Sequence, residues 1–153
     1  MKRAGIYRLK DRILIHPWQL TDMGLGVATE PYVVLPLDVD SAKLGLSARE
    51  TLNQSGQTVR ETTDWKALAA ARLKAAGVKS QKAFQTNASY VCLHLSDKQL
   101  LVEPSRNGGT QGDAKGFEAL PAFSVALAAD LPAADLGNAI RQALQISHEQ
   151  SSA

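Results

Sequence analysis

Residues 125–147, "VALAADLPAADLGNAIRQALQIS", repeat the pattern of residues 33–55, "VVLPLDVDSAKLGLSARETLNQS", at an offset of 92 positions. Each stretch starts as an apolar run, passes an aspartate and a short turn, and continues through Leu-Gly into a sequence of helical periodicity. Nine of the 23 positions are identical. The identical pairs are Val33/Val125, Leu35/Leu127, Asp38/Asp130, Ala42/Ala134, Leu44/Leu136, Gly45/Gly137, Arg49/Arg141, Leu52/Leu144 and Ser55/Ser147. We interpret them as two pseudo-symmetric strand–helix units against one sheet, with chance similarity in an Ala- and Leu-rich sequence as the alternative.

Gly45 and Gly137 fall in the first turn of each expected helix. Glycine inside a helix costs about 1 kcal/mol relative to alanine, so both positions need a structural reason. We expect each helix to cross close to its own preceding strand, where a side chain would collide.

The other strands are predicted in hairpins. Residues 5–20, "GIYRLKDRILIHPWQL", predict two strands around a Lys-Asp turn. Pro17 is expected to end the second strand or to confine it to an edge, because proline cannot donate to a β-ladder. Residues 89–95 and 98–104, "SYVCLHL" and "KQLLVEP", predict a second hairpin.

Helices are predicted in three places. The first follows Asp38, and a capping box at Ser47 would delay its start until after Leu46. "TTDWKALAAARLKAAG", residues 62–77, predicts the second helix, with Thr63 as N-cap and a glycine stop. The third starts near residue 130. Strands in runs predict an α+β fold with a mixed or antiparallel central sheet of about five to six strands and three main helices.

Length and composition predict one globular domain over residues 1–153, with residues 148–153 as a frayed tail. A net charge of +2 without a clustered basic stretch gives no reason to expect nucleic-acid binding. The single cysteine, Cys92, suits a reducing compartment. No apolar run reaches the ~20 residues that span a bilayer, and no signal peptide is evident. We therefore expect a cytoplasmic protein without a membrane partner.

The residues that could carry chemistry do not form a recognisable motif. The three histidines lack metal-ligand spacing, so neither a metal nor another cofactor is expected. Cys92 and His94 would share one face of a strand, as an activated thiol requires, although a buried structural cysteine is the stronger interpretation. His16 and His94 could act as the acid–base pair of a small hydrolase or nuclease only if their strands are adjacent. Without a convergent polar cluster, a non-catalytic binding protein is favoured over an enzyme.

A partner surface is predicted on exposure grounds alone, because exposed loops commonly carry binding residues. The glycine-rich loop 105–116 and the loop 22–30 are the candidate segments, and Trp18 is expected to be more exposed than Trp65. The predicted partner-binding residues are Trp18, Asp22, Glu30, Arg106, Asn107, Asp113, Lys115 and Glu118.

Several segments resemble one family of immunity proteins of bacterial contact-dependent growth inhibition (CDI). The similarity runs over most of residues 5–147 and consists mainly of packing patterns. The segments are "ILIHP" (13–17), "DWKALAAARLKAAGVKSQKAF" (64–84), "LLVEPSRN" (100–107), "GF" and "LP" (116–121), and "LPAADLGNAIRQALQIS" (131–147).

The resemblance implies a small cytoplasmic protein that binds one toxin domain, the C-terminal part of a large exported protein and often a nuclease. Binding would cover the toxin active site or block its access to substrate. The family has no shared catalytic residues to carry over. The slightly basic charge of this chain disfavours mimicry of a nucleic acid and favours a mixed-charge interface, or an acidic patch built locally from residues such as Asp22, Glu30, Asp113 and Glu118. A small hydrolase, or an adaptor domain that dimerises through the repeat, remains as an alternative, and the sequence leaves the oligomeric state open.

Overall fold

The computed structural model describes residues 1–60 and 64–151. Its strands are β1 (Lys2–Arg8), β2 (Arg12–Thr21), β3 (Gly26–Ala28), β4 (Val33–Pro36), β5 (Thr58–Val59), β6 (Ser89–Leu95), β7 (Gln99–Asn107), β8 (Phe117–Ala119) and β9 (Val125–Ala128). They form one sheet with the main order β3-β2-β1-β6-β7-β8, in which β4 and β5 also pair with β2, and β9 pairs with β7. All these pairings are antiparallel except β2–β5, which is parallel. The predicted α+β fold with a mixed or antiparallel central sheet is confirmed.

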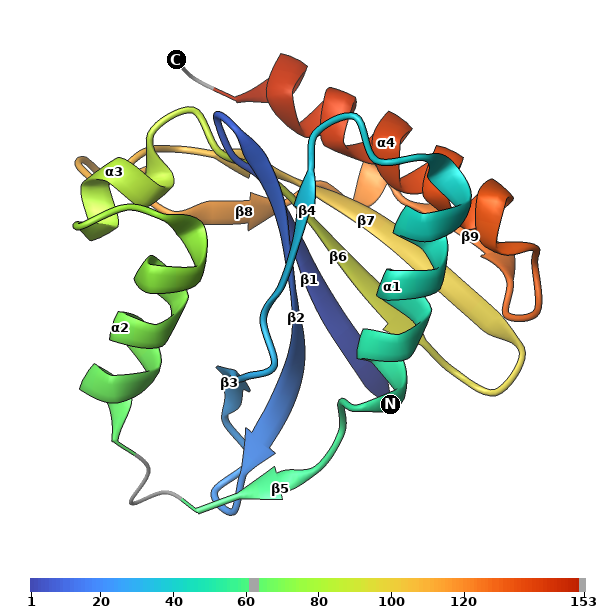
Figure 1. Cartoon of the computed structure of the whole chain (residues 1–153), viewed down its shortest axis with the longest axis horizontal. Coiled ribbons are helices and arrows are strands. Elements are labelled where there is room, and N and C mark those ends of the chain that lie inside the picture. The colour runs from blue at the N-terminus through green and yellow to red at the C-terminus, as the bar shows by residue number, and fades with distance from the viewer. Residues whose placement is uncertain (61–63, 152–153) are drawn as a thin grey trace.

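Two layers of helices flank this curled sheet (Figure 1). The helices are α1 (Ser41–Asn53), α2 (Trp65–Ala76), α3 (Gln81–Gln85) and α4 (Ala133–Gln150), with a 3-10 turn at Pro121–Phe123. Side chains alternate along each strand, so neighbouring residues face opposite layers. In β2, Ile13 packs into the core under α1 and α4, whereas Leu14 packs toward α2 and α3.

The main core lies between the sheet and the helix pair α1 and α4. Leu44 and Leu52 of α1 and Leu136 and Leu144 of α4 are at most 1% exposed. In both helices the buried residues recur at the three- and four-residue intervals of an amphipathic helix, which explains why these stretches fold as helices against an apolar sheet face.

The two strand–helix units of the sequence repeat are β4–α1 and β9–α4. The Ile13–Leu35 pair of β2 and β4 has its counterpart in the Leu100–Leu127 pair of β7 and β9. The hairpins β1–β2 and β6–β7 are joined by the antiparallel pairing of β1 with β6. The same pseudo-twofold relation therefore holds at the centre of the sheet. The predicted pseudo-symmetry is therefore present in the strand registers.

The two repeated glycines lie where α1 and α4 cross. A Cβ atom on Gly45 would lie 1.8 Å from the Ala133 carbonyl oxygen, and one on Gly137 would lie 1.8 Å from the Ser41 carbonyl oxygen. The expected reason for these glycines, a close approach to the preceding strand, was wrong. Because each glycine lacks a side chain, the first turn of the other helix can pack directly against its backbone.

The repeated arginines also connect the two units. Arg49 of α1 donates to the Leu131 carbonyl oxygen at 2.6 Å, in the turn before α4. Arg141 of α4 donates to the carbonyl oxygens of Leu37 and Val39, in the turn before α1. Each unit therefore supplies a hydrogen-bond donor to the turn of the other, which explains why arginine recurs at both positions.

Two sequence-based boundaries were wrong. β2 does not end at Pro17 but continues to Thr21, because Pro17 lies where the strand changes partners between β4, which pairs up to Ile15, and β3, which pairs from Trp18. α1 starts at Ser41 rather than after Leu46, because the Asp40 side chain caps it by accepting from the Lys43 N–H at 2.8 Å. The predicted N-cap Thr63 lies outside the described residues.

The end of α4 covers part of the predicted tail, residues 148–153. α4 continues to Gln150, and the Ser151 hydroxyl donates to the Ser147 carbonyl oxygen. The Asn107 backbone N–H donates to the Ser151 oxygen at 2.9 Å. These contacts tie the end of α4 to the end of β7.

Candidate interaction surface

The sheet face opposite α1 and α4 carries a cluster of aromatic side chains. Tyr7 of β1 lies at its centre, and its ring centroid is 4.9 Å from that of Phe84 in α3 and 4.5 Å from that of Tyr90 in β6. Phe84 is 1% exposed and attaches the α2–α3 segment to the sheet. The cluster therefore forms a second, smaller core.

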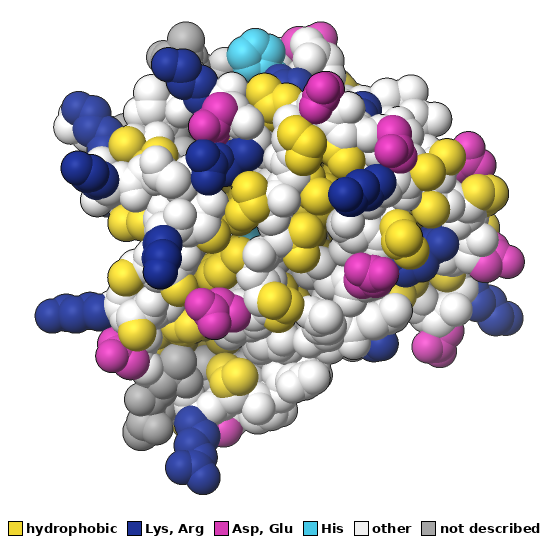
Figure 2. All heavy atoms as spheres, in the orientation of Figure 1, with side chains coloured by type: hydrophobic (Ala, Val, Ile, Leu, Met, Phe, Trp, Pro, Cys, Tyr) yellow, Lys and Arg dark blue, Asp and Glu magenta, His cyan; other side chains and the backbone are white. Residues whose placement is uncertain are grey.

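A groove of about 220 Å³ opens beside this cluster, between α2 and strands β2 and β3. Its lining includes Trp18, Val27, Tyr32, Trp65, Leu68 and Arg72. Figure 2 shows hydrophobic side chains in the hollow between α2, at the left, and the central strands. Trp65 is 45% exposed, so an aromatic ring is available at the groove wall. Trp, Tyr and Arg are the residue types that most often dominate binding energy at protein interfaces.

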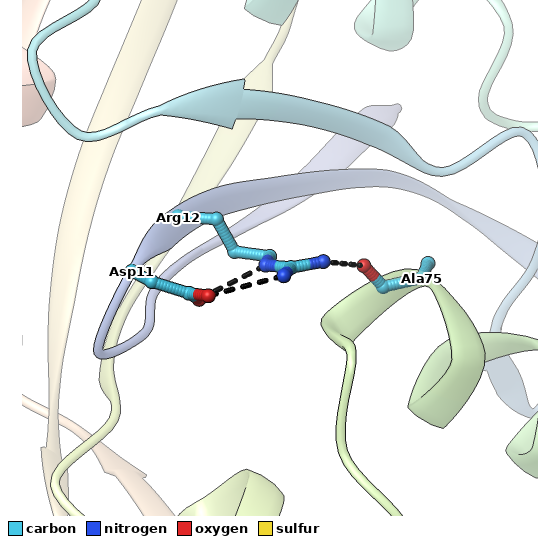
Figure 3. A network of polar contacts seen from close by, with 3 residues as sticks. All are labelled: Asp11, Arg12 and Ala75. Atoms are coloured by element: carbon cyan, nitrogen blue, oxygen red, sulfur yellow. Dashed lines mark hydrogen bonds and ion pairs between the residues drawn. The ribbon is translucent and has the colours of Figure 1, made fainter.

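The groove exists because α2 is held mainly at one end. Within α2 only Ala76, its last residue, is buried. Arg12, at the start of β2, donates to the Ala75 carbonyl oxygen at 3.2 Å while Asp11 accepts from the same guanidinium at 2.9 Å (Figure 3). A cation suits this end of a helix, where unpaired carbonyl groups carry partial negative charge. The other end of α2 stands away from the sheet, which leaves room for the groove.

Two guanidinium groups lie at the groove. The Arg3 guanidinium is 5.6 Å from the centroid of the Trp18 ring, and that of Arg72 is 4.9 Å from the centroid of the Phe84 ring. Within the described ranges, neither arginine forms an ion pair with a carboxylate. Both therefore keep a positive charge that no described acid neutralises directly.

The candidate acid–base histidines are not on adjacent strands, as their pairing required, because β1 lies between β2 and β6. His16 is fully buried, and its Nδ1 lies 3.0 Å from the Pro17 carbonyl oxygen. Since a carbonyl only accepts, Nδ1 carries the proton and Nε2 is the bare nitrogen. His94 Nε2 instead lies 3.5 Å from a Glu103 carboxylate oxygen.

Cys92 is on the same face as His94, as expected from their spacing. Burial raises the pKa of the Cys92 thiol to about 11, so the thiol is protonated at neutral pH. A protonated thiol is a poor nucleophile, because the thiolate is the reactive form. The environment of Cys92 therefore favours a structural role.

Burial lowers the pKa of His16 from 6.5 to about 4. The unfolded chain binds the proton more tightly, so His16 favours folding above pH 6.5 and loses this contribution as the pH falls toward 4. Between pH 7 and pH 5 we expect His16 to reduce the free energy of unfolding by about 2 kcal/mol. Urea unfolding of wild type and His16→Gln at pH 7 and pH 5 measures the contribution of His16. The carboxylates titrate equally in the two proteins, so the difference between their losses of unfolding free energy belongs to His16. Equal losses in the two proteins would contradict the assignment.

No group of three or more His, Cys, Asp or Glu side chains suited to a metal ion occurs among the described residues. In the same part of the chain, no helix is long and apolar enough to cross a membrane.

The predicted partner-binding residues fall into two groups. Trp18, Asp22 and Glu30 lie in or near β2 and β3, and Trp18 lines the groove. The second group lies in or near β7 and β8, at the other end of the strand order. It comprises Arg106, Asn107, Asp113, Lys115 and Glu118. The structure therefore does not bring the eight residues into one site.

Within the second group, Asp113, Lys115 and Glu118 are exposed, and Arg106 pairs with Glu118 at 2.9 Å. Asn107 is 4% exposed, contrary to the exposure for which it was selected. Its side-chain amide donates to the Gln85 and Ala88 carbonyl oxygens, at 2.7 and 2.9 Å. Asn107 therefore joins β7 to the end of α3.

Sequence reasoning missed five residues of the groove, namely Tyr32, Trp65, Leu68, Ala69 and Arg72. It also ranked the tryptophans in the wrong order, because Trp18 is the half-buried one and Trp65 is exposed. Trp65, Leu68 and Arg72 recur at three- and four-residue intervals, which marks one face of a helix. That pattern indicates an apolar stripe but does not reveal that the stripe faces a groove.

The comparisons with known proteins identify the fold and the family. Residues 2–147 match the family CdiI, described as CDI immunity protein. The chain belongs to this family of CDI immunity proteins. The resemblance predicted from the sequence is thus confirmed, and no curated protein sequence matches the chain.

Two solved structures have the same fold as this CDI immunity protein. A Neisseria meningitidis protein of unknown function, NMB0488, aligns with a TM-score of 0.76 and 21% identity, covering 95% of this chain and 94% of the other. A chain of the CdiA-CT/CdiI toxin and immunity complex from Yersinia pseudotuberculosis aligns with a TM-score of 0.72 and 13% identity. That alignment covers 94% of this chain and 95% of the other.

Proposed function

We propose that this CDI immunity protein binds one cognate toxin domain in a one-to-one complex and thereby neutralises it. The observation that carries the proposal is the family match over residues 2–147. The fold similarity to a chain of a toxin and immunity complex agrees with it.

The immunity protein acts without catalysis. His16 is buried and His94 pairs with Glu103, so their ring nitrogens do not converge on one substrate position. An acid–base mechanism needs both groups within hydrogen-bond reach of the same substrate. A surface that binds by shape and charge needs no such cluster.

The toxin is proposed to be a nuclease, and the complex to form in the cytoplasm, as the family resemblance implies. The exposed residues of the predicted set are retained as candidate contacts, namely Asp22, Glu30, Asp113, Lys115 and Glu118. Because the chain has a net charge of +2, we do not assign it a role as a nucleic-acid mimic. Inhibition instead uses a mixed-charge interface that covers the toxin active site or hinders access to it.

The first experiment is co-purification of the tagged chain with the toxin domain encoded next to it, followed by calorimetric titration and a toxin activity assay. We expect a nanomolar complex of one-to-one stoichiometry and loss of toxin activity. Absence of a complex at micromolar concentrations would contradict the proposal. Assays of His16→Ala and His94→Ala for hydrolase activity would then test the alternative.

A further inference from the structure

The two halves of the sheet agree on one face and differ on the other. Under the pseudo-twofold relation, each position of β1 and β2 has a counterpart in β6 and β7. The four pairs in the core under α1 and α4 stay apolar, namely Ala4/Val91, Ile6/Leu93, Ile13/Leu100 and Ile15/Val102, whereas the Arg8/Leu95 pair at the strand end does not. The four core pairs are apolar in both hairpins because they pack against α1 and α4, which are the two copies of the repeated helix.

On the opposite face, chemical character is kept in a single pair. In the middle of the strands the pairs are Arg3/Tyr90, Gly5/Cys92, Tyr7/His94, Leu14/Leu101, His16/Glu103 and Trp18/Ser105, and at the ends of β2 and β7 they are Arg12/Gln99 and Leu20/Asn107. Only Leu14 and Leu101 match. The pseudo-symmetric scaffold does not require the two hairpins to differ on this face. The difference therefore indicates that β1 and β2 have a role on this face that β6 and β7 do not share.

The α2–α3 segment adds a second asymmetry on the same face. It follows the first unit, and no counterpart to it occurs among the described residues of the second. Residues 65–87 contain five basic side chains and no acidic one: Lys66, Arg72, Lys74, Lys79 and Lys82. The four lysines are exposed. α2 forms one wall of the aromatic groove, and of the five basic residues Arg72 lines it.

Two described acidic residues near the groove, Asp64 and Glu30, each act on a group of this chain. Asp64 caps α2 by accepting from the Ala67 N–H at 3.1 Å. Glu30 acts on Tyr32, whose pKa is raised mainly by burial, with a smaller contribution from the Glu30 charge. The cations at the groove are Arg72, which lines it, Arg3, whose guanidinium lies over Trp18, and the exposed Lys66, which follows Trp65 in the chain. A ligand that fills the groove must therefore present apolar surface together with negative charge.

We infer that the groove between α2 and strands β2 and β3 is the toxin-docking surface, and that it receives an acidic segment of the toxin bearing an apolar side chain. This inference rests on the proposed function and adds the surface and the chemistry of the partner. Trp18, Tyr32 and Trp65 contact the apolar side chain, and the cations attract the carboxylates. Such complementary charge accelerates association as well as fixing the orientation of the partners.

Two substitutions with matched controls test the surface by calorimetric titration against the cognate toxin domain. We expect Trp65→Ala to weaken binding at least about 10-fold, because exposed aromatic anchors dominate such interfaces. Lys66→Glu should weaken it by about 5-fold and more strongly at low salt. The controls are Phe123→Ala, which removes another aromatic ring that is 40% exposed, and Lys43→Glu, which reverses an exposed charge on α1. Both controls should bind within about 2-fold of wild type.

Hydrogen exchange of the toxin domain identifies the docked segment. The toxin segment protected by wild type but not by Trp65→Ala should contain Asp or Glu beside an apolar residue. A protected segment with only basic charge overturns the inference. If both Trp65→Ala and Lys66→Glu bind the toxin domain with wild-type affinity, the assignment of the groove as the docking surface is wrong, whereas the proposed immunity function still stands. Failure of the wild-type chain to bind the toxin domain defeats the proposed function itself.

A basic aromatic groove also resembles sites for single-stranded nucleic acid, which stack bases on aromatic rings. The same variants are therefore titrated with a fluorescent single-stranded oligonucleotide. We expect no binding at micromolar concentrations. Micromolar binding that is lost in Trp65→Ala would overturn the assignment of a toxin segment to the groove.

Discussion

Gly45→Ala is expected to lower the free energy of unfolding by about 3 kcal/mol, at the upper end of typical overpacking costs. The new methyl group would lie 1.8 Å from the Ala133 carbonyl oxygen, which is backbone and cannot rotate away. α1 and α4 must therefore separate, which loosens the main core. The gain of about 1 kcal/mol in helix propensity is too small to compensate. Urea unfolding measures the loss from the shift of the transition midpoint.

The pseudo-symmetric change Gly137→Ala is expected to cost the same within about 1 kcal/mol, since its Cβ would meet Ser41 as closely. The double variant should cost less than the sum, because helices already separated by one methyl group leave space for the second. Lys43→Ala is the control, an exposed position on the same helix. Its effect should stay within about 0.5 kcal/mol. If Gly45→Ala lowered the free energy of unfolding by less than about 0.5 kcal/mol, α1 and α4 would not be in close contact at this position.

Phe84→Ala is expected to lower the free energy of unfolding by about 4 kcal/mol. The ring is 1% exposed, packs edge-on against Tyr7 and lies under the Arg72 guanidinium. Its removal leaves a cavity where α3 meets the sheet. Urea unfolding gives the loss, and amide hydrogen exchange should show the largest decrease in protection in α2 and α3. Protection lost uniformly over the chain would contradict this local role.

Phe123→Ala is the matched control for Phe84→Ala. Both substitutions remove the same side chain, but Phe123 is 40% exposed in a 3-10 turn at the surface. We expect a loss below about 1 kcal/mol, because little apolar area returns to water and the space left is open to solvent. Equal losses in the two variants would contradict the packing of Phe84 in the aromatic cluster.

The candidate surface was harder to predict than the fold. Exposure reasoning selected Trp18, which lines the groove, but also Asn107, which is buried because its amide bonds to the chain beyond α3. Trp65 reads as part of an apolar helical stripe, and such stripes usually face a core. Nothing in the local sequence shows that α2 is attached to the sheet by its last turn alone. The groove follows from that attachment.

The sequence by itself determined the architecture, because hydrophobic periodicity and caps act over a few residues. The alternation in β1 and β2, the Gly77 stop and the repeat of residues 33–55 in residues 125–147 predict the α+β fold and its two units. Only the tertiary structure decided the partners of these elements. It placed Gly45 and Gly137 at a helix crossing and put β1 between His16 and His94. It also placed Trp65 and Arg72 of α2 in one groove with Trp18 of β2. Such contacts join residues far apart in the chain, and local propensity carries no information about them.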